Sequence, residues 1–240
     1  MGLKQSIRRL LGKQRPGDTK GGFLPTLQQF ADQAPVRLCL DVGANAGHFA
    51  REFRTAFPPA TIHCFEPGEE AFQQLQTLAG QDSQVRAHRT ALGNRSGSQT
   101  FFLNAKSVTH SLLPVAADAT QWAPATHITP TGTAEVKVAT CDEFCAAHSI
   151  NHVSLLKVDT QGYDLKVLEG ARGLLESGKC DWIYVEMMFV PIYDGQCYFH
   201  ELYSYLIARR FSLFRFYGGV HSPSGKLKWT NGLFSRAGLV

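Results

Sequence analysis

The sequence predicts an α/β protein with a doubly wound, mostly parallel β-sheet. Three observations support this: apolar strand-like segments alternate with helix-length stretches, a glycine-containing loop follows the first strand directly, and acidic residues end several strands. Strands that alternate with helices form parallel sheets with helices on both faces. With 240 residues and 44% hydrophobic content, the chain can bury one large core.

The first strand–helix–strand unit is the clearest part of the pattern. An apolar strand at 37–40 leads into a glycine loop at 41–47, an amphipathic helix at 48–57 and a second strand that ends at Glu66. In a parallel sheet, such a unit gathers main-chain amides and a carboxylate around an adenosine-like ligand at the carboxyl edge of the strands. A cofactor site is therefore predicted there.

The remaining elements follow the same rhythm, with one interruption. The expected elements are a helix at 69–78, a strand at 85–92, a strand at 153–159, a helix at 164–175, a strand at 181–187, a helix at 199–210 and a closing hairpin at 211–236. Between 97 and 138, short polar alternations surround a stretch rich in Pro and Thr. This region is predicted to be a short antiparallel insertion or lid.

The chain is expected to consist of a basic, flexible tail at 1–22 and one domain at 23–240. The tail has six basic residues and one acidic residue, while the whole chain has a net charge of +4. It fits either a solvated leader or a short amphipathic turn that touches an anionic membrane or a partner. The start of the chain lacks the apolar centre of a secretory signal, and no apolar stretch reaches the length of a membrane span, so a cytoplasmic protein is expected. The scattered basic residues of the domain do not favour nucleic-acid binding.

The loop at 41–47 distinguishes between two kinds of cofactor. Gly43 and Gly47 are separated by three other residues, so the middle glycine that lets a main chain approach a pyrophosphate is missing. This spacing favours S-adenosylmethionine, with Glu66 accepting hydrogen bonds from both ribose hydroxyls. The predicted cofactor-binding residues are Asp41, Gly43, Asn45, Gly47, Glu66, Pro67 and Ala91. Two other interpretations remain: the glycines serve only packing, or Asp41 only caps the loop.

Candidate catalytic residues lie at strand ends and in the lid. Asp159 and Glu186 end two strands of the same sheet, and converging carboxylates are a placement that perturbs acidity. Either is a candidate base for a substrate hydroxyl, although each also fits a helix-capping role. His110, in the lid, is a third candidate. Tyr193 and Tyr198, in a turn-rich stretch, are candidate acceptor contacts, whereas most other aromatic residues fit the core.

The six cysteines do not indicate a metal or redox centre. Their spacing contains no paired C-x-x-C motif, and no histidine cluster accompanies them. Cys39 and Cys64 lie in apolar strands and are expected to be buried thiols. No metal ligands are predicted, and dependence on a divalent metal is left open.

Several separated motifs resemble those of the FkbM-type methyltransferases. They are DVGANAGHF, FEP, FFLN with SVTHSLL, TCDEF, LKVDTQGYDLKVLEGA and WIYVEM, which together extend over about 36–234. The resemblance implies a Rossmann-like, seven-stranded class I methyltransferase fold that uses S-adenosylmethionine. It also implies O-methylation of a small-molecule or glycan acceptor, such as a sugar or a polyketide-like natural product. Many members carry Glu where this chain has Gln161.

Two other functions share parts of this pattern. A non-catalytic scaffold that only binds the cofactor would keep the pocket, but the intact Asp41, Gly43, Glu66 and Asp159 do not indicate a decayed site. An NAD(P)-dependent oxidoreductase would share the fold and the acidic residue, but the missing middle glycine disfavours it. The sequence does not predict an oligomeric state.

Overall fold

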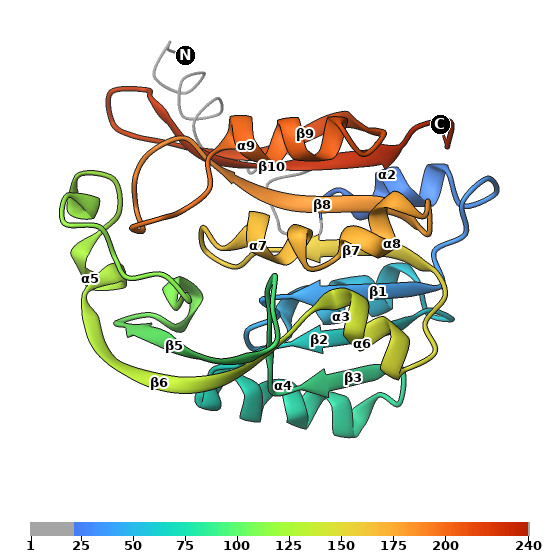
Figure 1. Ribbon diagram of the computed structural model, residues 1–240, viewed down its shortest axis with the longest axis horizontal. Helices are drawn as coiled ribbons and strands as arrows, with labels where there is room; N and C mark the ends of the chain where they lie inside the picture. The colour runs from blue at the N-terminus through green and yellow to red at the C-terminus, as the bar shows by residue number, and fades with distance from the viewer. Residues whose placement is uncertain (1–21, 240) are drawn as a thin grey trace, which may run out of the picture.

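The computed structural model describes residues 22–239 and is built around a seven-stranded sheet (Figure 1). The strand order is β3-β2-β1-β7-β8-β10-β9. The strands are β1 (Leu38–Val42), β2 (Thr61–Phe65), β3 (Val85–His88), β7 (Val153–Val158), β8 (Cys180–Met188), β9 (Phe211–His221) and β10 (Leu227–Arg236). The first five in spatial order pair in parallel, whereas β10 is antiparallel to both neighbours. The predicted mostly parallel sheet is confirmed.

Helices cover both faces of this sheet. One face carries α2 (Leu24–Gln29), α3 (His48–Ala56) and α4 (Glu69–Gln81), and the other carries α6 (Cys141–Ala147), α7 (Asp164–Glu169), α8 (Arg172–Glu176) and α9 (Phe199–Ile207). Alternate strand residues serve the two cores: Cys39 packs with the first group and Leu40 with the second. A strand buried on both faces needs a continuous apolar run, which explains the composition of the central strands.

The segment between β3 and α6 forms a second, smaller sheet that extends from the main one. Its strands are β4 (Ala91–Leu92), β5 (Gly97–Asn104) and β6 (Pro130–Ala139), and β5 pairs antiparallel with β6. Between them lie η1 (Ser107–Thr109), η2 (Ala119–Gln121) and α5 (Ala125–Ile128). We call residues 97–139 the lid. It lies at the left of Figure 1, on the side where β1 and β2 end.

Two predicted elements are interrupted in the structure. The strand expected at 85–92 divides into β3 and β4, and β4 joins the lid strand β6 rather than the main sheet. The helix expected at 164–175 breaks at Gly170, where an added Cβ would lie 1.9 Å from the main-chain oxygen of Gly93. Asp142 then caps the new helix by accepting hydrogen bonds from the N–H groups of Gly173 and Leu174. The close approach of the backbones at Gly170 and Gly93 therefore interrupts the helix that the sequence periodicity predicts.

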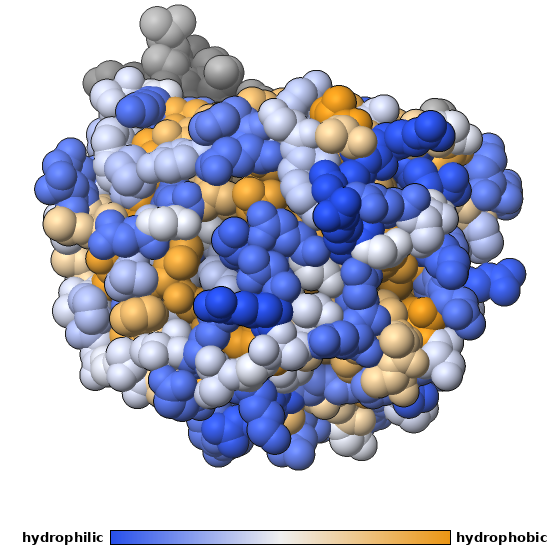
Figure 2. Space-filling view, viewed as in Figure 1, coloured by the Kyte–Doolittle hydropathy of each residue, from blue (hydrophilic) through white to orange (hydrophobic). Residues whose placement is uncertain are grey.

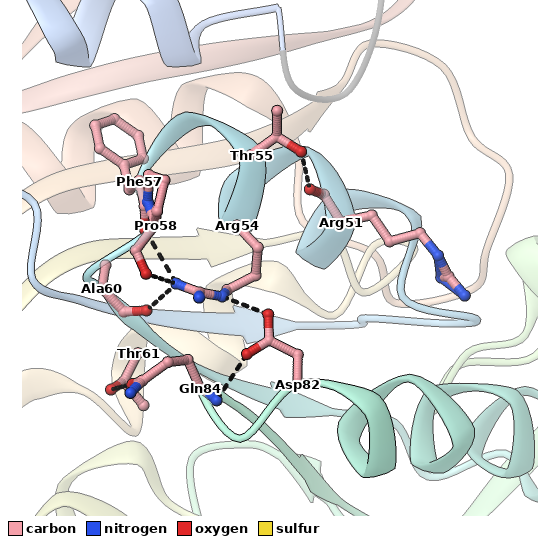
Figure 3. Close-up of polar contacts among 9 residues, drawn as sticks. All are labelled: Arg51, Arg54, Thr55, Phe57, Pro58, Ala60, Thr61, Asp82 and Gln84. Carbon is pink, nitrogen blue, oxygen red and sulfur yellow. Dashed lines mark hydrogen bonds and ion pairs between the residues drawn. The ribbon is translucent and has the colours of Figure 1, made fainter.

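Arg54 ties the end of α3 to the neighbouring loops (Figure 3). Its Nη1 donates to the oxygens of Phe57 (3.1 Å) and Ala60 (2.6 Å), and its Nε donates to Asp82 Oδ2 (2.8 Å). Asp82 also accepts the N–H of Gln84 at 2.9 Å, and the hydrogen bond from Arg54 lowers the pKa of this carboxyl group. These contacts link the loop before β2 to the turn before β3.

Other sequence predictions concern the tail, the cysteines and the membrane. The predicted basic tail falls outside the described residues except for residue 22. All six cysteines are free and buried, as expected for Cys39 and Cys64. Within residues 22–239, no helix combines the length and apolar character needed to cross a bilayer.

Candidate active site

A cleft opens at the carboxyl ends of β1, β2 and β7, beneath the lid. It contains about 580 Å³ of space free of protein atoms, including its open mouth. We call it the first cleft. Its lining includes seven of the predicted site residues: Gly43, Asn45, Glu66, Pro67, Ala91, His110 and Asp159. The structure thus brings together side chains that are more than a hundred positions apart in the chain.

The loop after β1 has the backbone of a tight strand-to-helix turn. Gly43, Asn45 and Gly47 all have positive φ angles, of 79°, 48° and 79°. An added Cβ on Gly43 would lie 2.0 Å from the main-chain oxygen of Asp159. Only glycine allows this approach. Gly43 therefore holds the ends of β1 and β7 together, whereas Gly47 precedes α3 and packs under Leu75.

Glu66 is a buried carboxylate at the wall of the first cleft, with 5% of its surface exposed. Its Oε2 accepts the N–H of Asn45 (2.9 Å) and its Oε1 accepts the N–H of Gly68 (2.8 Å). Burial raises the pKa of Glu66 to about 7, and the two main-chain hydrogen bonds oppose this shift. A carboxylate oxygen has two acceptor positions, so each one is able to accept a second hydrogen bond.

Asp41 lies under the loop instead of in the cleft. It is fully buried, and its Oδ1 accepts a hydrogen bond from Lys157 Nζ at 2.8 Å. The two residues are direct neighbours across β1 and β7. Lys157 is also buried, and its Nζ lies 3.9 Å from Asp159 Oδ2. This ion pair joins the two strands that carry the cleft. A direct contact of Asp41 with a cofactor stays a prediction.

Gln161 connects the two predicted catalytic carboxylates. Its Nε2 donates to Asp159 Oδ1 and to Glu186 Oε2, both at 3.0 Å. Its Oε1 lies 3.1 Å from the hydroxyl of Tyr193, which is also 2.9 Å from the oxygen of Thr109. Burial raises the pKa of Tyr193, so this hydroxyl remains a donor. An uncharged amide is thus placed between two acidic side chains.

The turn that carries Gln161 is stabilised by hydrogen bonds to a side chain of the next helix. Gln161 and Gly162 have positive φ angles of 56° and 90°. Asp164, at the start of α7, accepts the N–H of Thr160 (2.9 Å) and of Gly162 (3.0 Å) with its two oxygens. Burial raises the pKa of Asp164 to about 6. This residue, which the sequence analysis did not select, fixes a strained turn at the end of β7.

His110 reaches the first cleft from the lid. Its Nδ1 accepts a hydrogen bond from the N–H of Asn104 at 3.0 Å, so the proton of the neutral ring lies on Nε2. Burial lowers the pKa of His110, and the nearby Glu70 opposes this shift. The neutral ring presents a donor to the cleft. This arrangement favours the carboxylates over His110 as proton acceptors.

A second cleft adjoins the first and contains about 660 Å³ of space free of protein atoms, including its mouth. The two clefts share Val108 and Gln161 in their linings. Glu186 and Tyr193 line the second cleft. Tyr198 lies outside both; it is half-buried at the start of α9, where its N–H donates to Glu201 Oε2 at 2.8 Å.

The first cleft fits S-adenosylmethionine. A buried carboxylate at Glu66 suits the ribose hydroxyls, and the positive-φ loop at 43–47 provides the close main-chain approach. Ala91 and Pro67 add small apolar surface to the lining. Within the described part of the chain, no group of three or more His, Cys, Asp or Glu side chains is placed to hold a metal ion.

The strand order is that of the class I methyltransferase fold. The sequence then identifies the family: residues 41–214 match the methyltransferase FkbM domain. This chain belongs to the FkbM methyltransferase family and is a methyltransferase. The oxidoreductase and scaffold alternatives are therefore not supported.

Individual proteins of this group are similar over part of their length. The 2-O-methyltransferase NoeI of Sinorhizobium fredii is 25% identical over 177 residues, which cover 68% of each chain. The hexuronic acid methyltransferase AglP of Haloferax volcanii is 26% identical over 155 residues, or 65% of this chain and 55% of AglP. The crystal structure of methyltransferase FkbM from Methylobacillus flagellatus aligns with a TM-score of 0.52 and 16% identity, over 83% of this chain and 43% of that one.

Proposed function

We propose that this chain transfers the methyl group of S-adenosylmethionine to a hydroxyl of a sugar or a glycan. The observation that carries the proposal is the pair of adjoining clefts with Asp159 on one side, Glu186 on the other and Gln161 between them. NoeI is named a 2-O-methyltransferase and AglP a hexuronic acid methyltransferase. Both names describe relatives, and they support an oxygen acceptor on a sugar.

The first cleft would hold the cofactor through Glu66, Asn45 and the main chain of the loop at 43–47. When bound, the cofactor supplies a methyl group on a positively charged sulfur, which leaves as the neutral thioether of S-adenosylhomocysteine. The protein contributes alignment of the acceptor with that methyl group, an effect that can supply about 7–11 kcal/mol.

The acceptor hydroxyl also has to lose a proton as its oxygen bonds to the methyl carbon. Asp159 is the proposed base, because it lines the first cleft and accepts a hydrogen bond from Gln161. Glu186, on the same amide, would orient the acceptor from the second cleft. A positioned base typically contributes about 10²–10⁴-fold to the rate.

The test is transfer of an isotopically labelled methyl group to a set of glycosides, measured for the wild type and for Asp159→Asn. The variant should bind S-adenosylhomocysteine normally and lose about 10²–10⁴-fold in kcat. Asp194→Asn is the matched control, since Asp194 is exposed and lines neither cleft. Full turnover by Asp159→Asn would exclude Asp159 as the base. Failure to methylate any sugar, in the presence of cofactor binding, would overturn the proposed acceptor class.

A further inference from the structure

The second cleft has an acidic side chain in its lining, and a lysine outside the lining contacts one of its walls. Glu186 lies at the inner end, next to Gln161 and the first cleft. Trp229 and Met188 line the cleft further out, and they pair directly across β10 and β8. Met188 follows Glu186 by two residues on β8, so the two side chains point to the same face and are separated by about 7 Å along the strand.

A cation accompanies this outer wall. Lys228 is half-buried, and its Nζ lies 4.6 Å from the centre of the Trp229 ring. The same Nζ donates to the oxygen of Trp122 at 2.9 Å, which holds the ammonium group against the indole. An ammonium group has three donors, so this contact leaves capacity for a ligand.

Apolar side chains also line the second cleft. Val108, Ile192 and Met188 contribute to the lining. In the space-filling view, apolar side chains gather over the lid at the left of the molecule (Figure 2). A compact ring with one polar edge and one apolar face fits such walls, because an indole packs against apolar faces while hydroxyls reach the polar groups.

We propose that the second cleft is the acceptor site and that it takes a pyranose ring carrying an acidic group, with that group beside Lys228 and the reacting hydroxyl beside Glu186. This inference rests on the proposed function. The carboxylates of Asp159 and Glu186 repel an anion at the inner end, whereas Lys228 attracts it at the outer end. Charge therefore selects both the ligand and its orientation.

The experiment compares matched pairs of glycosides that differ only at C6: 4-nitrophenyl glucoside with glucuronide, galactoside with galacturonide, and mannoside with mannuronide. KM and kcat for methyl transfer are measured, together with acceptor affinity for the protein saturated with S-adenosylhomocysteine. At least one uronide should have a lower KM than its neutral partner. A charge-assisted hydrogen bond corresponds to about 10- to 100-fold in affinity.

Variants locate the effect. Lys228→Met should raise the KM for the uronide by about 10- to 100-fold and leave the KM for the neutral glycoside unchanged. Lys228→Arg keeps the positive charge, so its KM for the uronide should stay close to that of the wild type. Lys137→Met, at an exposed position of β6 outside both clefts, is the matched control. Cofactor affinity should be the same in all three variants, which shows that the fold is intact.

The possible failures are distinguishable. Efficient methylation of neutral glycosides, with uronides no better, would overturn the acidic-sugar inference and leave the proposed function in place. An unchanged uronide KM in Lys228→Met would overturn the role of Lys228. Absence of both turnover and binding for every pair would overturn the proposed sugar acceptor and this inference with it.

Discussion

Among substitutions that remove one charged side chain, Lys157→Met is the one for which the structure predicts the largest decrease in the free energy of unfolding. Lys157 and Asp41 are both buried, and their Nζ–Oδ1 distance is 2.8 Å. At this distance, two unit charges attract by about 6 kcal/mol with an effective dielectric constant of about 20. The cost of desolvating both ions offsets much of that attraction, so the pair itself contributes little net stability.

Removing only one partner has a different effect. Among residues 22–239, Asp41 Oδ2 has no hydrogen-bond partner, so Lys157→Met leaves a buried carboxylate with both oxygens unpaired. Breaking a buried pair in this way costs about 3–5 kcal/mol. For a domain of this size, that loss corresponds to a decrease in Tm of about 6–20 °C.

The assay is urea unfolding followed by tryptophan fluorescence and circular dichroism. The double variant Asp41→Asn with Lys157→Met should recover most of the loss, because no unpaired charge is left inside. Lys166→Met is the matched control: its Nζ lies 3.0 Å from Glu169 Oε2, but 45% of its side chain is exposed, so a change below about 1 kcal/mol is expected. A Lys157→Met protein within 1 kcal/mol of the wild type would refute this reasoning.

Three further predictions concern the cleft and the sheet. Calorimetry at several pH values should show that S-adenosylhomocysteine binds more weakly as the pH falls through about 7, where Glu66 gains a proton, and more than tenfold more weakly in Glu66→Ala. Gly43→Ala should destabilise the domain by about 2–4 kcal/mol, because its Cβ meets a main-chain oxygen at a φ of 79°; Gly80→Ala, in open space on α4, should be neutral or stabilising in the same unfolding assay. Burial lowers the pKa values of His63 and His88 from 6.5 to about 4, so the free energy of unfolding should be fully retained above pH 6.5 and decrease as the pH falls toward 4. Replacing both histidines by Gln should flatten that decrease, and an unchanged slope would contradict the assignment.

The general position of the site followed from the sequence because it depends on local patterns. The spacing of Gly43 and Gly47 and the acidic residue after β2 place a cleft at the carboxyl edge of any parallel sheet with this connectivity. Asp159 follows directly after β7, and Glu186 lies two residues before the end of the adjacent strand β8, so both lie near the edge at which the sequence places them. Their roles in binding and catalysis remain predictions.

Several features of the site involve residues that are distant in the sequence. Lys157 carried a recognisable signal, since a single lysine in the apolar run 153–158 has to find a buried partner, but the run does not reveal that the partner is Asp41. In the sequence, Gln161 stood out only because many members of the family carry a charged Glu at this position. Its bridge between Asp159 and Glu186 depends on the positive φ of a turn that Asp164 holds in place.

The sequence by itself determined the α/β class, the glycine loop after β1 and the acidic residues at or near the ends of β7 and β8, because strand periodicity and turn chemistry act over a few residues. The tertiary structure decided that Asp41 is turned inward to a lysine, that Gln161 joins the carboxylates and that Trp229 and Lys228 stand beside a second cleft. These relations depend on strand order and on close packing between distant segments, which bring together side chains that local patterns leave independent.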